Sequence, residues 1–166
     1  MSEHIELLVP VKANTGLNLC KILLWVLTVI LALAGLVGVF GLIPIIVAIA
    51  TGVGAYFVGL RVDTEYEYTL TDRELDVDII YSKEKRKHIT TFDLNKLELM
   101  ARLGSYRLDG QEHRGLKTED YSSKEESRKK DVFVMIYEGS RRILIEPDEK
   151  LFKAIYSVAP SKVFKD

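Results

Sequence analysis

A long uncharged stretch near the N-terminus constrains this chain more than any other feature. No Asp, Glu, Lys, Arg or His occurs between Lys21 and Arg61. A bilayer core of about 30 Å takes roughly 20 apolar residues in a helix, so a run about twice that length predicts two membrane spans. We expect helices over about 22–39 and 42–60, joined as an antiparallel hairpin. The break falls at 38–44, because its glycines loosen a helix and its proline suits the first turn of the next one.

The charge of the chain is segregated around this stretch. We expect residues 1–21 to form an N-terminal segment, 22–60 the hairpin and 61–166 a domain large enough for its own core. The formal net charge of −1 gives no electrostatic argument for nucleic-acid binding. A cleavable signal peptide is not expected, because the first apolar run is followed at once by a second one.

Basic residues flank the hairpin and are missing from its tip. Lys12 and Lys21 precede it and Arg61 closes it. The positive-inside rule therefore predicts a two-span protein of the cell membrane with both termini in the cytoplasm. The chain has one cysteine, Cys20, so it forms no internal disulfide.

Small residues recur along both expected spans at a spacing of three and four. They are Thr28, Ala32 and Gly35 in the first span, and Ala48, Gly52, Ala55 and Gly59 in the second. Helices in lipid approach closely where side chains are small, so we expect the two stripes to face each other. The alternative is that Gly and Ala are simply common in spans. Because the spans carry no ionisable group, the hairpin is interpreted as an anchor or an oligomerisation element and not as a transport path.

Beyond the spans the apolar pattern changes to the period of two that is typical of strands. We expect a meander of about six antiparallel strands, over 62–68, 75–80, 88–94, 97–103, 131–138 and 141–146. A polar segment over 105–130 is expected to be a long mobile loop. An amphipathic helix follows Pro147 and ends before Pro160, with its apolar face on the sheet. The fold class is therefore α+β.

Four short motifs in this domain carry a resemblance to a known family. They are Tyr68-Thr69-Leu70-Thr71-Asp72, the strand Leu75 to Ile80, the basic turn Lys83 to Lys87, and the corner Phe92 to Leu97. With two preceding spans, the chain resembles the bacterial pleckstrin-homology-like (PH-like) membrane proteins. More narrowly, it is similar to a small two-span family of Gram-positive bacteria whose domain has no known function. The resemblance implies a cytoplasmic PH-like antiparallel β half-barrel on a membrane hairpin, and it implies no activity.

No constellation in the sequence predicts catalysis, a cofactor or a metal. His4, His88 and His113 are scattered, without ligand spacing to one another or to the cysteine. Asp76 and Asp78 share a strand face, which alternation explains as the solvated face. We therefore expect no enzyme.

Basic residues give a candidate surface. Arg61, Lys83, Lys85, Arg86 and Lys87 would gain about 1 kcal/mol each beside anionic lipid, although we prefer a solvated hairpin turn as the explanation of the last four. Two functions follow. One is a non-enzymatic adaptor or scaffold that presents the PH-like domain at the cytoplasmic membrane surface to a protein partner or another copy. The alternative is an anionic-lipid-sensing or envelope-associated regulatory protein, or an accessory subunit of a membrane complex.

Overall fold

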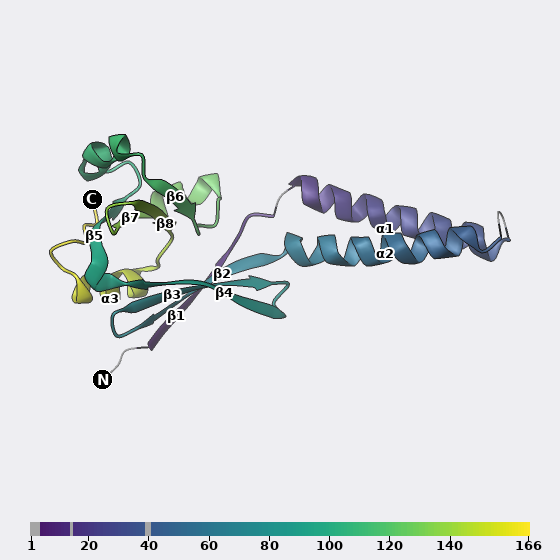
Figure 1. The fold of residues 1–166 in the computed structure, drawn as a ribbon, viewed down its shortest axis with the longest axis horizontal. Coiled ribbons are helices and arrows are strands. Elements are labelled where there is room, and N and C mark those ends of the chain that lie inside the picture. Colours follow the sequence, from purple (N-terminus) through teal and green to yellow (C-terminus); the bar gives the residue numbers. More distant parts are fainter. Residues whose placement is uncertain (1–3, 14, 39–40) are drawn as a thin grey trace. The chain divides into compact units, whose positions relative to one another are not determined.

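The computed structural model describes residues 4–13, 15–38 and 41–166, apart from the side chains of 112–114. Figure 1 shows the elements in chain order. They are β1 (His4–Pro10), α1 (Thr15–Leu36), α2 (Ile43–Val62), β2 (Thr64–Thr71), β3 (Glu74–Tyr81), β4 (Lys85–Asp93), η1 (Leu94–Lys96), β5 (Leu97–Arg102), η2 (Tyr106–Arg114), β6 (Lys117–Asp120), η3 (Glu126–Asp131), β7 (Phe133–Tyr137), β8 (Arg141–Ile145) and α3 (Glu149–Val158). They form two compact units: a helical hairpin with the β3–β4 turn, and a β-domain made of the remaining residues.

The helices α1 and α2 are each long and apolar enough to cross a membrane. α1 has no buried residue, and α2 buries only four. An apolar helix that exposes most of its surface is not the core helix of a soluble domain. The two expected spans are thus present as helices, although α1 begins at Thr15, seven residues before the expected start. The expected end of the first helix, at residue 39, lies outside the described residues.

The hairpin interrupts the β-domain between two adjacent strands. β1 precedes α1, yet it pairs antiparallel with β2, which follows α2, in the register Ile5↔Leu70 and Val9↔Tyr66. The interpretation of residues 1–21 as a separate N-terminal segment therefore needs correction, because residues 4–10 are the edge strand of the first sheet. Ile5 and Val9 are 2% and 1% exposed, so β1 contributes to the core as well as to the sheet.

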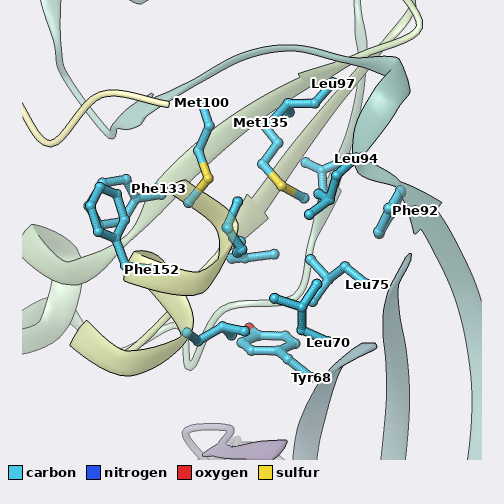
Figure 2. Packing of buried hydrophobic residues seen from close by; sticks show 14 of the residues in the cluster. Tyr68, Leu70, Leu75, Phe92, Leu94, Leu97, Met100, Phe133, Met135 and Phe152 are labelled. Carbon is cyan, nitrogen blue, oxygen red and sulfur yellow. The ribbon is translucent and has the colours of Figure 1, made fainter. Parts of the chain in front are cut away.

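The β-domain contains two four-stranded sheets, with strand orders β1-β2-β3-β4 and β5-β7-β8-β6. Their inner faces and α3 share one apolar cluster, part of which is shown in Figure 2. There Phe152 of α3 lies against Phe133 of β7, with ring centroids 5.0 Å apart. Leu151 and Ile155 are fully buried. The expected α+β architecture, with mainly antiparallel sheets and a C-terminal amphipathic helix packed on them, is confirmed.

The segment 105–130, expected to be a mobile loop, is built into the second sheet. Its strand β6 pairs with β8, and the pairing is parallel. Ser122 and Ser123 are buried, and the amide of Tyr121 donates to the carbonyl of Leu144 at 2.9 Å. The prediction from composition was wrong because these polar groups are satisfied locally: the Asp120 carboxylate accepts hydrogen bonds from the amide and the hydroxyl of Ser122.

Candidate functional site

The outer face of the first sheet carries a network of charged side chains. Arg86 on β4 forms an ion pair with Glu67 on β2, and its Nε lies 3.9 Å from the Asp78 carboxylate. His88 shares a 2.8 Å hydrogen bond with Asp78. Glu67 is 4% exposed, and this burial raises the pKa of its carboxyl while Arg86 opposes the rise. Asp78, which was expected on the solvated face of its strand, and Glu67 are therefore covered by their neighbours.

This network divides the predicted basic surface. Lys83, Lys85 and Lys87 are exposed and form no ion pair within the described part of the chain, whereas Arg86 neutralises a buried acid. Arg61 is exposed in the last turn of α2. The first two lysines and Arg61 belong to the hairpin unit, while Arg86 belongs to the β-domain. The five predicted cations are thus divided between the two compact units.

A cavity of about 370 Å³ lies in the β-domain beside the edge strand β1. Its wall is partly apolar and partly charged. The apolar residues are Leu7, Leu8, Val9, Phe133, Pro147 and Phe152; the charged residues are Arg102, Arg128, Asp131, Glu146, Asp148, Glu149 and Lys165. A concave apolar surface with a few polar groups is the usual form of a binding site.

Most of the charges in this cavity already have structural partners. The buried carboxylate of Glu146 forms an ion pair with Nε of Arg128 at 2.6 Å and accepts a hydrogen bond from the amide of Ser123 at 3.0 Å. The Asp148 side chain caps α3 by accepting from the amide of Leu151 at 2.7 Å. These contacts hold the wall of the cavity together.

Arg102 is the exception among the cavity's charges. Its Nε is buried and has no hydrogen-bond partner among the described residues. The guanidinium lies 5.5 Å from the centre of the Phe133 ring, a cation–π contact that orients it without using its N–H donors. Lys165 and Asp131 likewise have no ion pair in the described ranges. The cavity charges without an ion pair in the described residues are thus two cations and two acids, because Asp148 accepts only a backbone amide. The buried Nε donor of Arg102, and not the net charge, is what favours a ligand that supplies an acceptor.

Sequence reasoning missed this cavity entirely. Arg102 stands at the end of β5, where a charged residue after an apolar strand carries no signal of its own. Leu7 to Val9 belong to a seven-residue strand whose partner is more than 50 positions away. The apolar alternation within His4–Pro10 was the one available sign that this segment pairs with a sheet.

In the hairpin, the structure brings the predicted small-residue stripes to one seam. A Cβ on Gly52 would lie 3.4 Å from Cγ2 of Thr28, and a Cβ on Gly35 would overlap with the side chain of Ile45. Ala48 and Ala55 are buried, and Ala32 is partly buried. Gly59 lies against the Lys21 stem, 3.5 Å from its Cε. Thr51, which the stripes did not include, meets Thr28 across the seam.

Within the described residues no group of three or more His, Cys, Asp or Glu side chains is arranged to hold a metal ion.

A family model described as "Bacterial PH-like domain (DUF6106)" matches residues 1–165. No curated protein and no solved structure matches the chain significantly.

Proposed function

The chain belongs to the bacterial PH-like domain family, and from this premise we propose that it is a non-enzymatic, membrane-anchored interaction protein. In this proposal the β-domain holds an extended segment of a protein partner in the cavity beside β1. The hairpin fixes the domain to the cytoplasmic surface of the cell membrane.

The edge position of β1 supports a strand-like occupant. β1 is the terminal strand of its sheet, so one side of its backbone pairs with β2 and the other pairs with no strand of the described residues. An extended peptide can add to such an edge through main-chain hydrogen bonds, while pockets select its side chains. Leu7, Leu8 and Val9 bring this edge directly to the cavity wall.

The single observation that carries the proposal is the buried Nε of Arg102, which has no hydrogen-bond partner among the described residues. A buried donor without an acceptor is costly, on the order of 1–3 kcal/mol, so a ligand that supplies the acceptor recovers that energy. A carboxylate matches a guanidinium in geometry and charge. Phe133 and Phe152 beside it offer apolar surface. The proposed partner segment therefore carries a carboxylate next to an apolar side chain.

The anchor is supported by the composition and connectivity of the hairpin. Both helices are long and apolar enough to cross a membrane. Because the strands on either side of the hairpin pair with each other, both ends of the hairpin lie on the same side of the bilayer. The basic flanks Lys12, Lys21 and Arg61 support a cytoplasmic location for that side by the positive-inside rule.

Recognition of anionic lipid by the β3–β4 turn is the second candidate. The observation in its favour is that Lys83, Lys85 and Lys87 are exposed and form no ion pair within the described ranges. Three lysines would supply about 3 kcal/mol at an anionic surface, and that attraction would fall as salt is added.

Photocrosslinking of the full-length protein in its native membrane tests the first proposal. A photoreactive residue at Leu8, which is 52% exposed on β1, should give a defined protein adduct. The matched control is Ile89, 37% exposed on β4 at the other edge of the same sheet, and it should give none. Arg102→Gln should lower the adduct yield at least about tenfold, because a charge-assisted hydrogen bond contributes about 1.5–3 kcal/mol.

The variant Lys85→Gln serves as the second control and should leave the adduct unchanged. An adduct at Ile89 equal to that at Leu8, or a yield indifferent to Arg102, would contradict the proposal. Loss of the adduct in Lys85→Gln and not in Arg102→Gln would favour the lipid-binding candidate.

A further inference from the structure

A second depression, of about 230 Å³, lies within the hairpin unit at the ends of the helices that adjoin the β-strands. Three segments of the chain form its wall. They are Lys21 and Trp25 of α1; Ala55, Tyr56, Gly59, Leu60 and Asp63 at the end of α2; and Ser82 and Glu84 of the β3–β4 turn. All of these residues belong to one compact unit. None of them lines the cavity beside β1.

Charges of both signs line this depression and lack partners. Lys21, Asp63 and Glu84 form no ion pair within the described part of the chain. Gly59 leaves room for the Lys21 stem, which passes 3.5 Å from the position of an added Cβ. The β3–β4 turn is tied to the end of α2 by a hydrogen bond from the Ser82 amide to the Asp63 carbonyl, at 2.6 Å.

Aromatic side chains form the deeper wall. Trp25 follows Lys21 by four residues, about 6 Å along the helix axis, and it is 49% exposed. Tyr56 on α2 is 53% exposed and also lines the depression. Trp and Tyr prefer the depth at which a bilayer changes from headgroups to acyl chains. The depression therefore lies at headgroup depth when the hairpin spans a membrane.

We propose that this depression binds the headgroup of a zwitterionic phospholipid that carries a primary ammonium group. The phosphate binds Lys21, the ammonium binds Asp63 and Glu84, and the glycerol and upper acyl chain lie along Trp25 and Tyr56. One cation beside two acids matches a phosphate linked to an ammonium, whereas a purely anionic headgroup would face two carboxylates. The inference rests on the membrane insertion proposed above, but not on the proposed binding of a peptide in the cavity beside β1.

The ammonium separates this ligand from a choline headgroup. A primary ammonium donates up to three hydrogen bonds, and each carboxylate can accept one. A quaternary ammonium donates none and would gain only charge attraction and contact with the aromatic rings. The structure therefore favours an ethanolamine headgroup over choline.

Trp25 is the sole tryptophan of the chain and lines the depression, so its fluorescence reports occupancy directly. The full-length protein is placed in phosphatidylcholine bilayers that contain equal mole fractions of an acyl-brominated lipid. The brominated lipid is phosphatidylethanolamine, phosphatidylglycerol or phosphatidylcholine. Brominated phosphatidylethanolamine should bind near Trp25 about two- to fivefold more strongly than the other two brominated lipids, because one or two exposed ion pairs raise the affinity by about that factor.

The double variant Asp63→Asn/Glu84→Gln should remove this preference, while the matched control Lys83→Gln on the same turn should retain it. Soluble phosphoethanolamine at millimolar concentration should not relieve the quenching, which identifies a bilayer lipid and not the free headgroup. Three results would overturn this inference and leave the proposed membrane insertion standing. They are relief of quenching by phosphoethanolamine, equal quenching by the three lipids, and stronger quenching by phosphatidylglycerol. Absence of quenching by every brominated lipid would also overturn the membrane insertion on which the inference rests.

Discussion

The hydroxyl of Thr28 donates a hydrogen bond to the hydroxyl of Thr51 at 2.9 Å, and this contact joins α1 to α2 near the middle of the hairpin. Thr51 in turn donates to the carbonyl of Val47 at 3.0 Å, so the hydroxyl hydrogens of both threonines form hydrogen bonds. Close contacts occur at intervals of seven residues on both sides of it. They join Lys21 to Gly59, Thr28 to Gly52 and Gly35 to Ile45. A seven-residue repeat is the period of antiparallel helices that pack as a coiled coil.

The tightest of these contacts predicts a sharp response to one methyl group. Gly35→Ala should loosen the hairpin, because its Cβ would overlap with Ile45. The matched control is Gly54→Ala on α2, where an added Cβ meets nothing within 4 Å. Disulfide trapping of a cysteine pair at Ala32 and Ala48 in full-length protein measures helix proximity. Trapping should slow in Gly35→Ala and stay unchanged in Gly54→Ala; equal rates in both variants would show that Gly35 has no role in the seam.

The pairing of β1 with β2 predicts that the hairpin can be removed. Replacing residues 13–63 with a short glycine-rich turn should give a water-soluble folded domain, because Pro10 and Glu65 are register partners at the end of the pair. A fragment of residues 64–166 lacks β1 and exposes the β2 edge, and it should be much less stable. Amide exchange of β2 distinguishes them: slow exchange in the linked protein and fast exchange in the fragment. Equal protection in both would mean that β1 is not part of the folded domain.

The basic turn should separate into one structural residue and three surface residues. Arg86→Gln leaves the buried carboxylate of Glu67 without its counter-charge, and a cost of about 1–3 kcal/mol is expected. Lys85→Gln removes an exposed lysine with no ion pair in the described residues, and the change should stay within about 0.5 kcal/mol. Amide exchange of β2 and β4 in the full-length protein measures both. Similar effects of the two variants would contradict the assignment of Arg86 to the sheet.

An ion pair between β6 and β8 predicts how stability depends on pH. Hydrogen bonds from Arg141, with help from Lys117 and Tyr121, lower the pKa of Glu119 to about 2, from an ordinary value of 4.5. A lowered pKa contributes stability that is present above about pH 4.5 and is lost as the pH falls from 4.5 toward 2. In Glu119→Gln, β6 should exchange faster than in the wild type at pH 6, and the difference should shrink by pH 3. A difference that stays constant with pH would show that Glu119 is not the group that titrates.

Sequence patterns predicted those parts of the molecule that depend on neighbours close along the chain. The uncharged run predicts the hairpin, and the apolar spacing of Leu151, Phe152 and Ile155 predicts the buried face of α3. The alternating strands and short turns from Thr64 to Asp93 depend on adjacent residues in the same way. In each case a local period carries the information.

The features that sequence reasoning missed depend on distant partners. β1 joins a strand on the far side of the hairpin, and β6 joins β8 in parallel through a segment of mainly polar composition. The cavity combines residues of β1, β5, η3, β7 and α3 with others from loops, and Arg102 stands out only by its missing partner. Neither a period nor a motif encodes such a meeting of side chains. Burial of Glu67 went unseen for the same reason, because the covering Arg86 comes from a different strand.

Cysteine labelling can determine on which side of the membrane the β-domain lies, and this measurement tests the proposed function most directly. In a Cys20→Ser background, single cysteines are placed at Leu42 near the hairpin tip, at Glu6 on β1 and at Lys129 on η3; all three side chains are exposed. An impermeant thiol reagent should label Leu42→Cys in intact cells, and label Glu6→Cys and Lys129→Cys only after the membrane is opened. Labelling of Glu6→Cys and Lys129→Cys in intact cells, with Leu42→Cys protected, would contradict a cytoplasmic PH-like domain anchored by this hairpin.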